Sequence, residues 1–153
     1  MPKLPNDAVG HGKMPVAKKT RTYLDTGVLF AAFRGEPDTR IRALNVLSDP
    51  AREFVASDYL MLETLPKATF FGNRREREFY EEYFDGTVKW ANTSKRLMKL
   101  AYEEACANGL AALDALHVSA AILCRAVEMI TTELPTKPMY RTKKVTLIHL
   151  LAL

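Results

Sequence analysis

Short apolar runs alternate with longer segments of helical periodicity from Thr22 to the C-terminus, and this alternation limits the possible folds more than any other feature. We predict strands at residues 22–24, 53–56, 88–90, 129–131 and 145–148. Strands that are separated by helices pair mainly in parallel, and the helices then cover both faces of the sheet. The expected fold class is therefore α/β, a three-layer α/β/α sandwich with a mainly parallel central sheet.

The segments between these strands carry helical spacing and capping signals. The first predicted helix spans 27–33, and the second is capped by Asp38 and turns Ile41, Leu44 and Leu47 inward. The third starts at Ser57 or Asp58 and includes Glu63, and the fourth contains the aromatic segment 79–84 and is ended by Gly86. The fifth is capped by Asn92 or Thr93 and ended by Gly109, and the sixth spans 110–125. We interpret the aromatic segment as core rather than as a surface for stacking bases. Residues 110–125 are apolar on nearly every side, which predicts burial between other elements.

The chain of 153 residues is long enough for one core, and it contains no internal repeat. We assign residues 21–153 to a single domain. Residues 1–20 hold several prolines and glycines without apolar periodicity, so we expect a flexible basic N-terminal arm there.

Charge is unevenly distributed along the sequence. Residues 1–22 and 134–153 each carry a net charge of +4, whereas the segment between them carries −4. Basic ends suit a polyanion such as RNA, although solvated surface cations are the alternative interpretation. The weak RNA-binding candidates are Lys18, Lys19, Arg21, Lys143 and Lys144.

Cysteine usage and hydropathy favour a cytoplasmic protein. Cys106 and Cys124 do not form a CxxC motif, and the N-terminal segment lacks the apolar run of a signal peptide. Residues 105–124 are apolar, but they contain Asp114, and a central Asp costs roughly 2.5–3.5 kcal/mol for membrane insertion. We therefore expect a buried helix there and no membrane contact.

Acidic residues occupy positions near the ends of several predicted elements. Asp25 follows the first strand, Glu63 lies in the helix after the second, Asp114 lies in the apolar helix, and Glu133 follows the fourth strand. Ligands of open α/β sheets bind beyond the carboxyl ends of the strands, so these acids can converge. Converging carboxylates repel one another unless a divalent cation binds between them. Taken singly, Asp25 could instead cap a helix, Glu63 could be solvated, and Asp114 could accept a buried hydrogen bond.

Sequence motifs around these acids resemble those of the PIN-domain nucleases, a family that includes the ribonuclease toxins of bacterial toxin–antitoxin pairs. The motifs are TYLDTGVL at 22–29, LMLETLPKA at 60–68, LDALHVSAA at 113–121 and ITTE at 130–133, and the resemblance extends from about residue 22 to 150. It implies an endoribonuclease that hydrolyses RNA phosphodiester bonds, in which Asp25, Glu63, Asp114 and Glu133 hold Mg²⁺ or Mn²⁺. It also implies a homodimer and inhibition by a small antitoxin protein.

One position departs from the family pattern, which usually has Asp where this sequence has Glu133. The longer side chain could reach the metal directly or through water, or it could weaken metal affinity. Thr26 and Thr131 could bond carboxylates or a phosphate oxygen, or only satisfy strand ends. His117, one helical turn after Asp114, is either a general base or a core histidine bonded to backbone.

Other functional classes fit the sequence less well. An aspartyl-nucleophile phosphatase requires a second Asp two residues after the first, where this chain has Gly27. The two cysteines fall within predicted helices, and no Gly-x-Ser-x-Gly motif occurs, which argues against a nucleophilic cysteine or serine enzyme. The remaining alternative is a catalytically weak or inactive PIN-like module that binds RNA or a protein partner.

Overall fold

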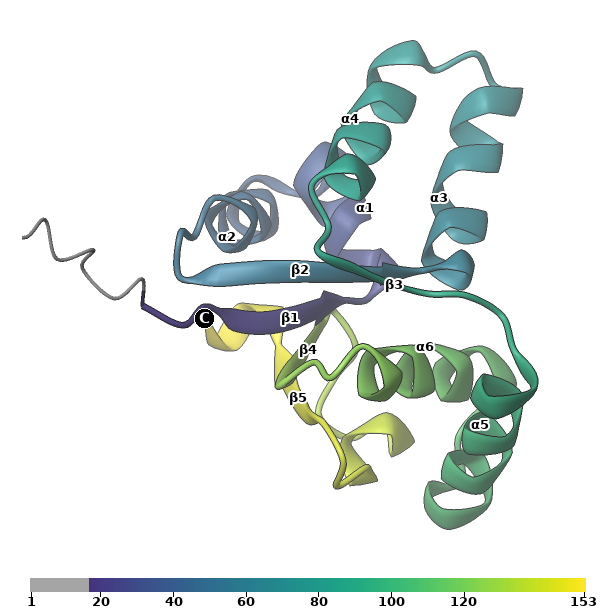
Figure 1. Ribbon diagram of the computed structural model, residues 1–153. Helices are drawn as coiled ribbons and strands as arrows, with labels where there is room; N and C mark the ends of the chain where they lie inside the picture. Colours follow the sequence, from purple (N-terminus) through teal and green to yellow (C-terminus); the bar gives the residue numbers. More distant parts are fainter. Residues whose placement is uncertain (1–16) are drawn as a thin grey trace, which may run out of the picture.

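The computed structural model describes residues 17–153, so most of the predicted arm, residues 1–16, lies outside the described residues. The central sheet consists of β1 (Thr20–Leu24), β2 (Arg52–Ser57), β3 (Lys89–Ala91), β4 (Glu128–Thr131) and β5 (Thr146–His149). The strand order is β3-β2-β1-β4-β5, and every neighbouring pair is parallel (Figure 1). The predicted strand segments are confirmed, with ends that differ by one or two residues.

Helices cover both faces of the sheet, which confirms the three-layer sandwich (Figure 1). One layer contains α1 (Thr26–Arg34), α2 (Pro37–Leu47), α3 (Asp58–Phe70) and α4 (Arg74–Asp85), and the other contains α5 (Lys95–Asn108) and α6 (Ala112–Leu123). Two short 3₁₀ helices, Pro138–Arg141 and Leu150–Ala152, flank β5.

Several helix ends follow local signals in the sequence. The hydroxyl of Ser57 accepts a hydrogen bond from the backbone N–H of Leu60 and caps α3. Gly109 ends α5 with φ of 68°, a left-handed conformation in which glycine has no Cβ penalty. Two predicted caps are wrong, because Glu36 precedes α2 in place of Asp38, and Ser94 caps α5 in place of Asn92 or Thr93.

Side chains alternate along the strands between two buried cores. Tyr23 of β1 and Met129 of β4 pack into the core under α5 and α6, whereas the next residues, Leu24 and Ile130, pack into the core under α1 to α4. Because both faces are covered, consecutive residues in the carboxyl halves of β1 and β2 are buried on opposite sides of the sheet.

The structure corrects one predicted helix face and confirms another. Ile41 and Leu44 of α2 were expected to face inward, yet they are 56% and 38% exposed, and α2 is buried through Ala43 and Val46. The aromatic segment of α4 belongs to the core as predicted, since Tyr80 is fully buried and its aromatic neighbours pack around it.

Hydropathy identifies no single helix among residues 17–153 that could cross a membrane. Only α5 and α6 taken together meet the length and composition required, and they are bent by 117° where they join.

The path of the chain reverses the strand order at the centre of the sheet. From β1 the chain builds β2 and β3 on one side, and it then crosses to β4 on the other side of β1. Such a reversal of strand order is where open α/β sheets bind ligands. The backbone N–H of Asp25 donates to the carbonyl of Ile130 over 2.9 Å, so the ends of β1 and β4 are held together at this point.

Candidate functional site

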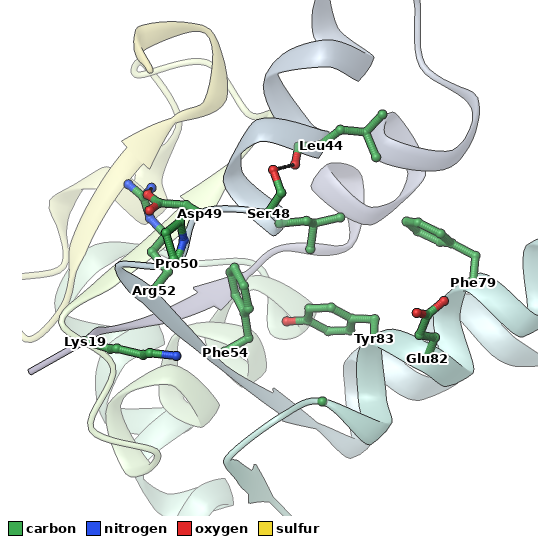
Figure 2. A pocket seen from close by; sticks show the side chains of 12 residues that line it. Lys19, Leu44, Ser48, Asp49, Pro50, Arg52, Phe54, Phe79, Glu82 and Tyr83 are labelled. Atoms are coloured by element: carbon green, nitrogen blue, oxygen red, sulfur yellow. Dashed lines mark hydrogen bonds and ion pairs between the residues drawn. The ribbon is translucent and has the colours of Figure 1, made fainter. Parts of the chain in front are cut away.

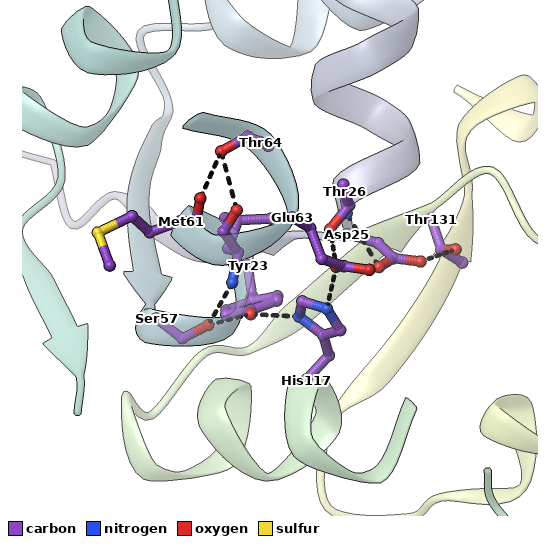
Figure 3. A network of polar contacts seen from close by, with 10 residues as sticks. Tyr23, Asp25, Thr26, Ser57, Met61, Glu63, Thr64, His117 and Thr131 are labelled. Carbon is purple, nitrogen blue, oxygen red and sulfur yellow. Dashed lines mark hydrogen bonds and ion pairs between the residues drawn. The ribbon is translucent and has the colours of Figure 1, made fainter. Parts of the chain in front are cut away.

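Asp25 lies at the carboxyl end of β1 and is the N-cap of α1. Its Oδ1 accepts a hydrogen bond from the backbone N–H of Thr26 over 2.9 Å. Its Oδ2 accepts a hydrogen bond from Oγ1 of Thr131, at the end of β4, over 2.8 Å (Figure 3). The cap and the contact with β4 coexist, and together they fix the orientation of this carboxylate at the carboxyl ends of β1 and β4.

Glu63 lies in the second turn of α3 and reaches Thr26, the residue next to Asp25. Its Oε2 accepts hydrogen bonds from Nε2 of His117, 2.6 Å away, and from Oγ1 of Thr26 (Figure 3). The bond from His117, aided by Thr26 and opposed by partial burial, holds the pKa of Glu63 below its usual value. The carboxylate is therefore a fixed, ionised group and not a freely solvated one.

His117 is almost fully buried in α6, and both of its ring nitrogens have side-chain partners. Nδ1 lies 2.7 Å from the hydroxyl of Tyr23, which lies 2.7 Å from Oγ of Ser57. One consistent set of protons connects them: Nε2–H donates to Glu63, Tyr23 donates to Nδ1, and Ser57 donates to Tyr23. Ser57 then accepts from its own helix cap, the N–H of Leu60. The predicted backbone partner of His117 is thus wrong, because the partners are side chains.

Asp114 lies in the first turn of α6 and is only half-buried, whereas much of the rest of this helix is buried as expected. Burial raises the pKa of Asp114, and the negative charges of Asp25, Glu133 and Glu63 raise it further, while His117 partly offsets them. These charges are close enough to act on one another, so the predicted acids share one electrostatic environment at the carboxyl end of the sheet.

Glu133 is exposed in the loop after β4. Its backbone N–H donates to Oγ1 of Thr131 over 3.0 Å, and its carbonyl accepts from the hydroxyl of Tyr140 over 2.9 Å. The backbone of Glu133 is therefore held in place, and the long side chain of this residue extends from a fixed position.

The acids face a common space without enclosing it. Among residues 17–153, no three Asp, Glu, His or Cys side chains gather tightly enough to surround one ion. Carboxylate oxygens are nevertheless the ligands that Mg²⁺ and Mn²⁺ prefer, and a cation between them would relieve the repulsion that raises the pKa of Asp114. The donor chemistry fits a divalent cation, and binding requires the side chains to move closer together.

Sequence reasoning missed three residues that build this site. Tyr23 bonds His117 and is itself bonded by Ser57, which the sequence marked only as a helix cap, because both contacts join residues that are distant in sequence. The third is Gly27: a Cβ at this position would lie 2.1 Å from Oγ1 of Thr132. The absence of a side chain at Gly27 therefore allows the loop after β4 to approach the start of α1.

The fold does not bring the basic residues that we predicted to bind RNA close to the acidic residues of the site. Arg21 is the second residue of β1, four residues before Asp25, and its guanidinium bonds the carboxylate of Glu53 and the carbonyl of Cys124. Lys144 precedes β5 and pairs with Glu104 over 3.0 Å. The predicted candidates Lys18, Lys19, Arg21, Lys143 and Lys144 therefore lie toward the amino-terminal edge of the sheet, opposite the acids.

Comparisons with known proteins agree with the fold and with the motifs. The sequence model of the PIN domain matches residues 22–132. A search of curated proteins finds no match.

Similar solved structures include VapBC2 from Rickettsia felis bound to a DNA fragment from the promoter, with a TM-score of 0.63, 17% identity, and coverage of 85% of this chain and 98% of that chain. A toxin–antitoxin complex from Klebsiella pneumoniae has a TM-score of 0.62, 20% identity, and coverage of 82% and 95%. DNA-bound VapBC from Salmonella typhimurium has a TM-score of 0.61, 14% identity, and coverage of 86% and 98%. At these identities the structures establish a shared fold, whereas the sequence model spans most of the domain and includes three of the four acids. The protein with this site at the ends of β1 and β4 belongs to the PIN domain family.

Proposed function

We propose that this protein is a metal-dependent endoribonuclease, the toxin of a toxin–antitoxin pair. The observation that carries the proposal is that this PIN domain places its acids together at the carboxyl end of the sheet: Thr131 bonds Asp25, His117 bonds Glu63, and the charges of both carboxylates act on Asp114. A site that holds several carboxylates together against their repulsion is suited to a divalent cation.

The residues divide into groups with different roles. Asp25, Glu63 and Asp114 would hold Mg²⁺ or Mn²⁺, and Glu133 would bind a second ion or orient the attacking water. The bound ion supplies Lewis acidity toward the phosphodiester and lowers the pKa of water. Thr131 orients Asp25, and Thr26 and His117 orient Glu63, so the chain sets the direction of two carboxylates before any ligand arrives.

The direct test is cleavage of RNA in the presence of Mg²⁺, of Mn²⁺ or of EDTA. We expect cleavage with either ion, none with EDTA, and none for Asp25→Asn with either ion. Asp85→Asn is a matched control, since Asp85 is an exposed acid at the end of α4. Cleavage that persists in EDTA, or that survives Asp25→Asn, would contradict the proposal.

The second candidate is a catalytically weak or inactive module that binds RNA or a protein partner. It is favoured by the exposure of Glu133 and by the lack of three acids close enough to enclose an ion among the described residues. Calorimetry distinguishes the two candidates, because a nuclease site must bind Mn²⁺ with a heat signal that Asp114→Asn lacks.

We also propose that an antitoxin-like protein covers a groove on the α1 to α4 layer. A cavity of about 530 Å³ between α2, β2 and α4 is lined by Leu44, Phe54, Phe79 and Tyr83, with Lys19 and Arg52 at its rim (Figure 2). A second cavity of about 350 Å³ shares Leu44 and Phe79 with it. The solved Klebsiella neighbour is itself a toxin–antitoxin complex, which supports a protein occupant.

This partner proposal is tested by co-expression with the product of an adjacent small reading frame. We expect a stable complex that Leu44→Glu weakens and that Val127→Glu, a control at a 62% exposed position before β4, leaves intact. A complex that tolerates Leu44→Glu would place the partner elsewhere.

A homodimer and a cytoplasmic location complete the proposal. Most of the aromatic segment of α4 packs into the core, and its partly buried Phe79 lines the groove proposed for the antitoxin-like protein, so we look for the dimer surface elsewhere. Met98 and Tyr102, one turn apart on α5, are 51% and 73% exposed and offer an apolar contact instead. Sedimentation should give about twice the chain mass for the parent and the monomer mass for Tyr102→Glu. A monomeric parent would contradict the homodimer and leave the proposed nuclease function untouched.

A further inference from the structure

A cavity of about 340 Å³ lies on the α5 and α6 layer, away from the acids. It is lined by Arg96, Lys99, Leu100 and Glu103 of α5, Ile122 and Leu123 of α6, Arg125 and Lys144. Arg125 precedes β4 and Lys144 precedes β5, so the cavity lies toward the amino-terminal edge of the parallel sheet. Its cations come from three separate segments that the fold brings together.

The charge of this cavity is strongly positive. Its lining includes four cations and one carboxylate, Glu103. Lys144 is paired with the buried Glu104 over 3.0 Å, whereas no ion pair to Arg96, Lys99 or Arg125 occurs within residues 17–153. Cations that are held together without carboxylate partners raise the local potential, and an anion in the cavity would lower it.

The backbone of Arg125 provides an independent observation. Its φ is 58°, and it is the only non-glycine residue with positive φ among those described. It closes α6 through a hydrogen bond from its N–H to the carbonyl of Ile122, and the next residue, Ala126, bonds back to Ala121. Glycine is usual at this position of a helix end, so a residue with a Cβ carries backbone strain there.

We propose that this basic cavity, defined by Arg96, Lys99, Arg125 and Lys144, binds the phosphate backbone of single-stranded RNA that extends from the acidic site. Guanidinium and ammonium groups are the side chains that bind phosphates along a flexible strand. The inference rests on the proposed ribonuclease function for its choice of RNA over other phosphate ligands.

The geometry predicts a dependence on RNA length. Asp114 and Leu123 are nine positions apart on α6, which corresponds to about 14 Å of helix at 1.5 Å per residue. An RNA must therefore extend several nucleotides beyond the acids to reach the cavity. A trinucleotide at the acidic site should not respond to the cavity, whereas a long strand should.

The test measures RNA binding by fluorescence anisotropy in EDTA, with Asp114→Asn as the background so that no cleavage occurs. The probes are labelled oligouridylates of about 20 nucleotides and of three nucleotides, because only the longer probe can contact several cations at once. Arg96→Gln combined with Lys99→Gln should weaken binding of the long probe about tenfold and reduce the slope of log affinity against log salt by about 1.4, at ~0.7 per phosphate contact. Arg40→Gln combined with Arg75→Gln, two exposed cations of the opposite layer, is the matched control.

The variant Arg125→Gly distinguishes an anion-binding role of Arg125 from a purely structural role. If the guanidinium serves RNA, this variant relieves the backbone strain, keeps or raises the melting temperature, and still binds the long probe more weakly. If Arg125 only stabilises the end of α6, the melting temperature falls and binding is unchanged, which would overturn the proposal.

Two further outcomes are decisive. Titration of inorganic phosphate identifies a free-anion site: phosphate binding that is lost in the Arg96 and Lys99 variant, with unchanged RNA affinity, would overturn the RNA proposal. Equal loss of affinity for the long and the short probe would also overturn it. Because binding is measured without metal, loss of binding in this variant would support the cavity even if the parent protein failed to cleave RNA.

Discussion

His117 Nε2 lies 2.6 Å from Oε2 of Glu63, and this contact joins α6 to α3 across the carboxyl end of the sheet. The opposite nitrogen of the ring is held by Tyr23 from β1. The orientation of Glu63 therefore depends on a buried chain of polar groups. This arrangement makes His117 a positioning residue.

His117→Phe should destabilise the protein by about 1–3 kcal/mol, because the buried hydroxyl of Tyr23 loses its acceptor. It should also weaken Mn²⁺ binding about tenfold, since Glu63 loses the donor that orients it. Urea denaturation and calorimetry measure the two effects. Tyr23→Phe is the control: it removes a hydroxyl from the same chain, lowers stability, and leaves the contact between His117 and Glu63 in place. Unchanged Mn²⁺ affinity in His117→Phe would contradict the positioning role.

Asp114→Asn should be at least as stable as the parent without metal, and its relative stability should increase with pH. The pKa of Asp114 is raised, so the folded state binds more protons than the unfolded state at intermediate pH. The parent then loses stability as pH rises from the unfolded pKa, about 3.9, through the higher folded pKa, and Asp114→Asn does not. Thermal melts in EDTA between pH 3 and 8, roughly that window and beyond, measure the difference. A parent that is more stable than the variant at neutral pH would indicate a structural hydrogen bond instead.

Gly27→Ala should destabilise the protein by about 1–3 kcal/mol, because the new Cβ would overlap Oγ1 of Thr132. Thr132→Ala removes that oxygen and should recover part of the loss when the two changes are combined. The double-mutant cycle isolates the coupling from the individual effects. Additive losses would show that the close approach of Gly27 and Thr132 does not limit the substitution.

Asp58→Ala should lower stability by about 1 kcal/mol at neutral pH and have little effect in strong acid. The side chain of Asp58 accepts hydrogen bonds from Nε1 of Trp90 over 2.8 Å and from the N–H of Thr93 over 2.7 Å. These bonds hold the pKa of Asp58 below its usual value, and the bond from Trp90 has the largest effect. Its contribution is therefore complete above the unfolded pKa and is lost as pH falls through the folded pKa.

Fluorescence of Trp90, the only tryptophan of the chain, reports on this contact directly. Asp85→Asn serves as the acid control at an exposed position. A stability difference between Asp58→Ala and the parent that is the same at acid and neutral pH would contradict the prediction.

Glu133→Asp should increase the rate of RNA cleavage if the length of Glu133 limits metal placement. The backbone of this residue is fixed by Thr131 and Tyr140, so shortening the side chain changes the position of the carboxylate and little else. Cleavage rates at saturating Mn²⁺ measure the effect, and Glu133→Gln is the control that removes the charge. Equal rates for parent and Glu133→Asp would show that the extra methylene is tolerated.

Local features of the sequence determined much of this protein. The alternation of apolar runs and helical segments predicted the sandwich, and Ser57 and Gly109 marked helix ends because caps depend on a few adjacent residues. Asp25 could be placed at a strand end because it directly follows the first apolar segment. The motifs around the acids identified the PIN domain family, which the sequence model of that family confirms.

Only the tertiary structure decided which distant side chains meet. His117 contacts Glu63 and Tyr23 across 54 and 94 residues of sequence, and Gly27 accommodates Thr132 because α1 and the loop after β4 are packed together. The inward face of α2 and the partial exposure of Asp114 likewise depend on how each helix is rotated and where it starts against the sheet. Periodicity constrains which residues share a face, but packing of complementary surfaces fixes which face is buried and which polar groups become partners.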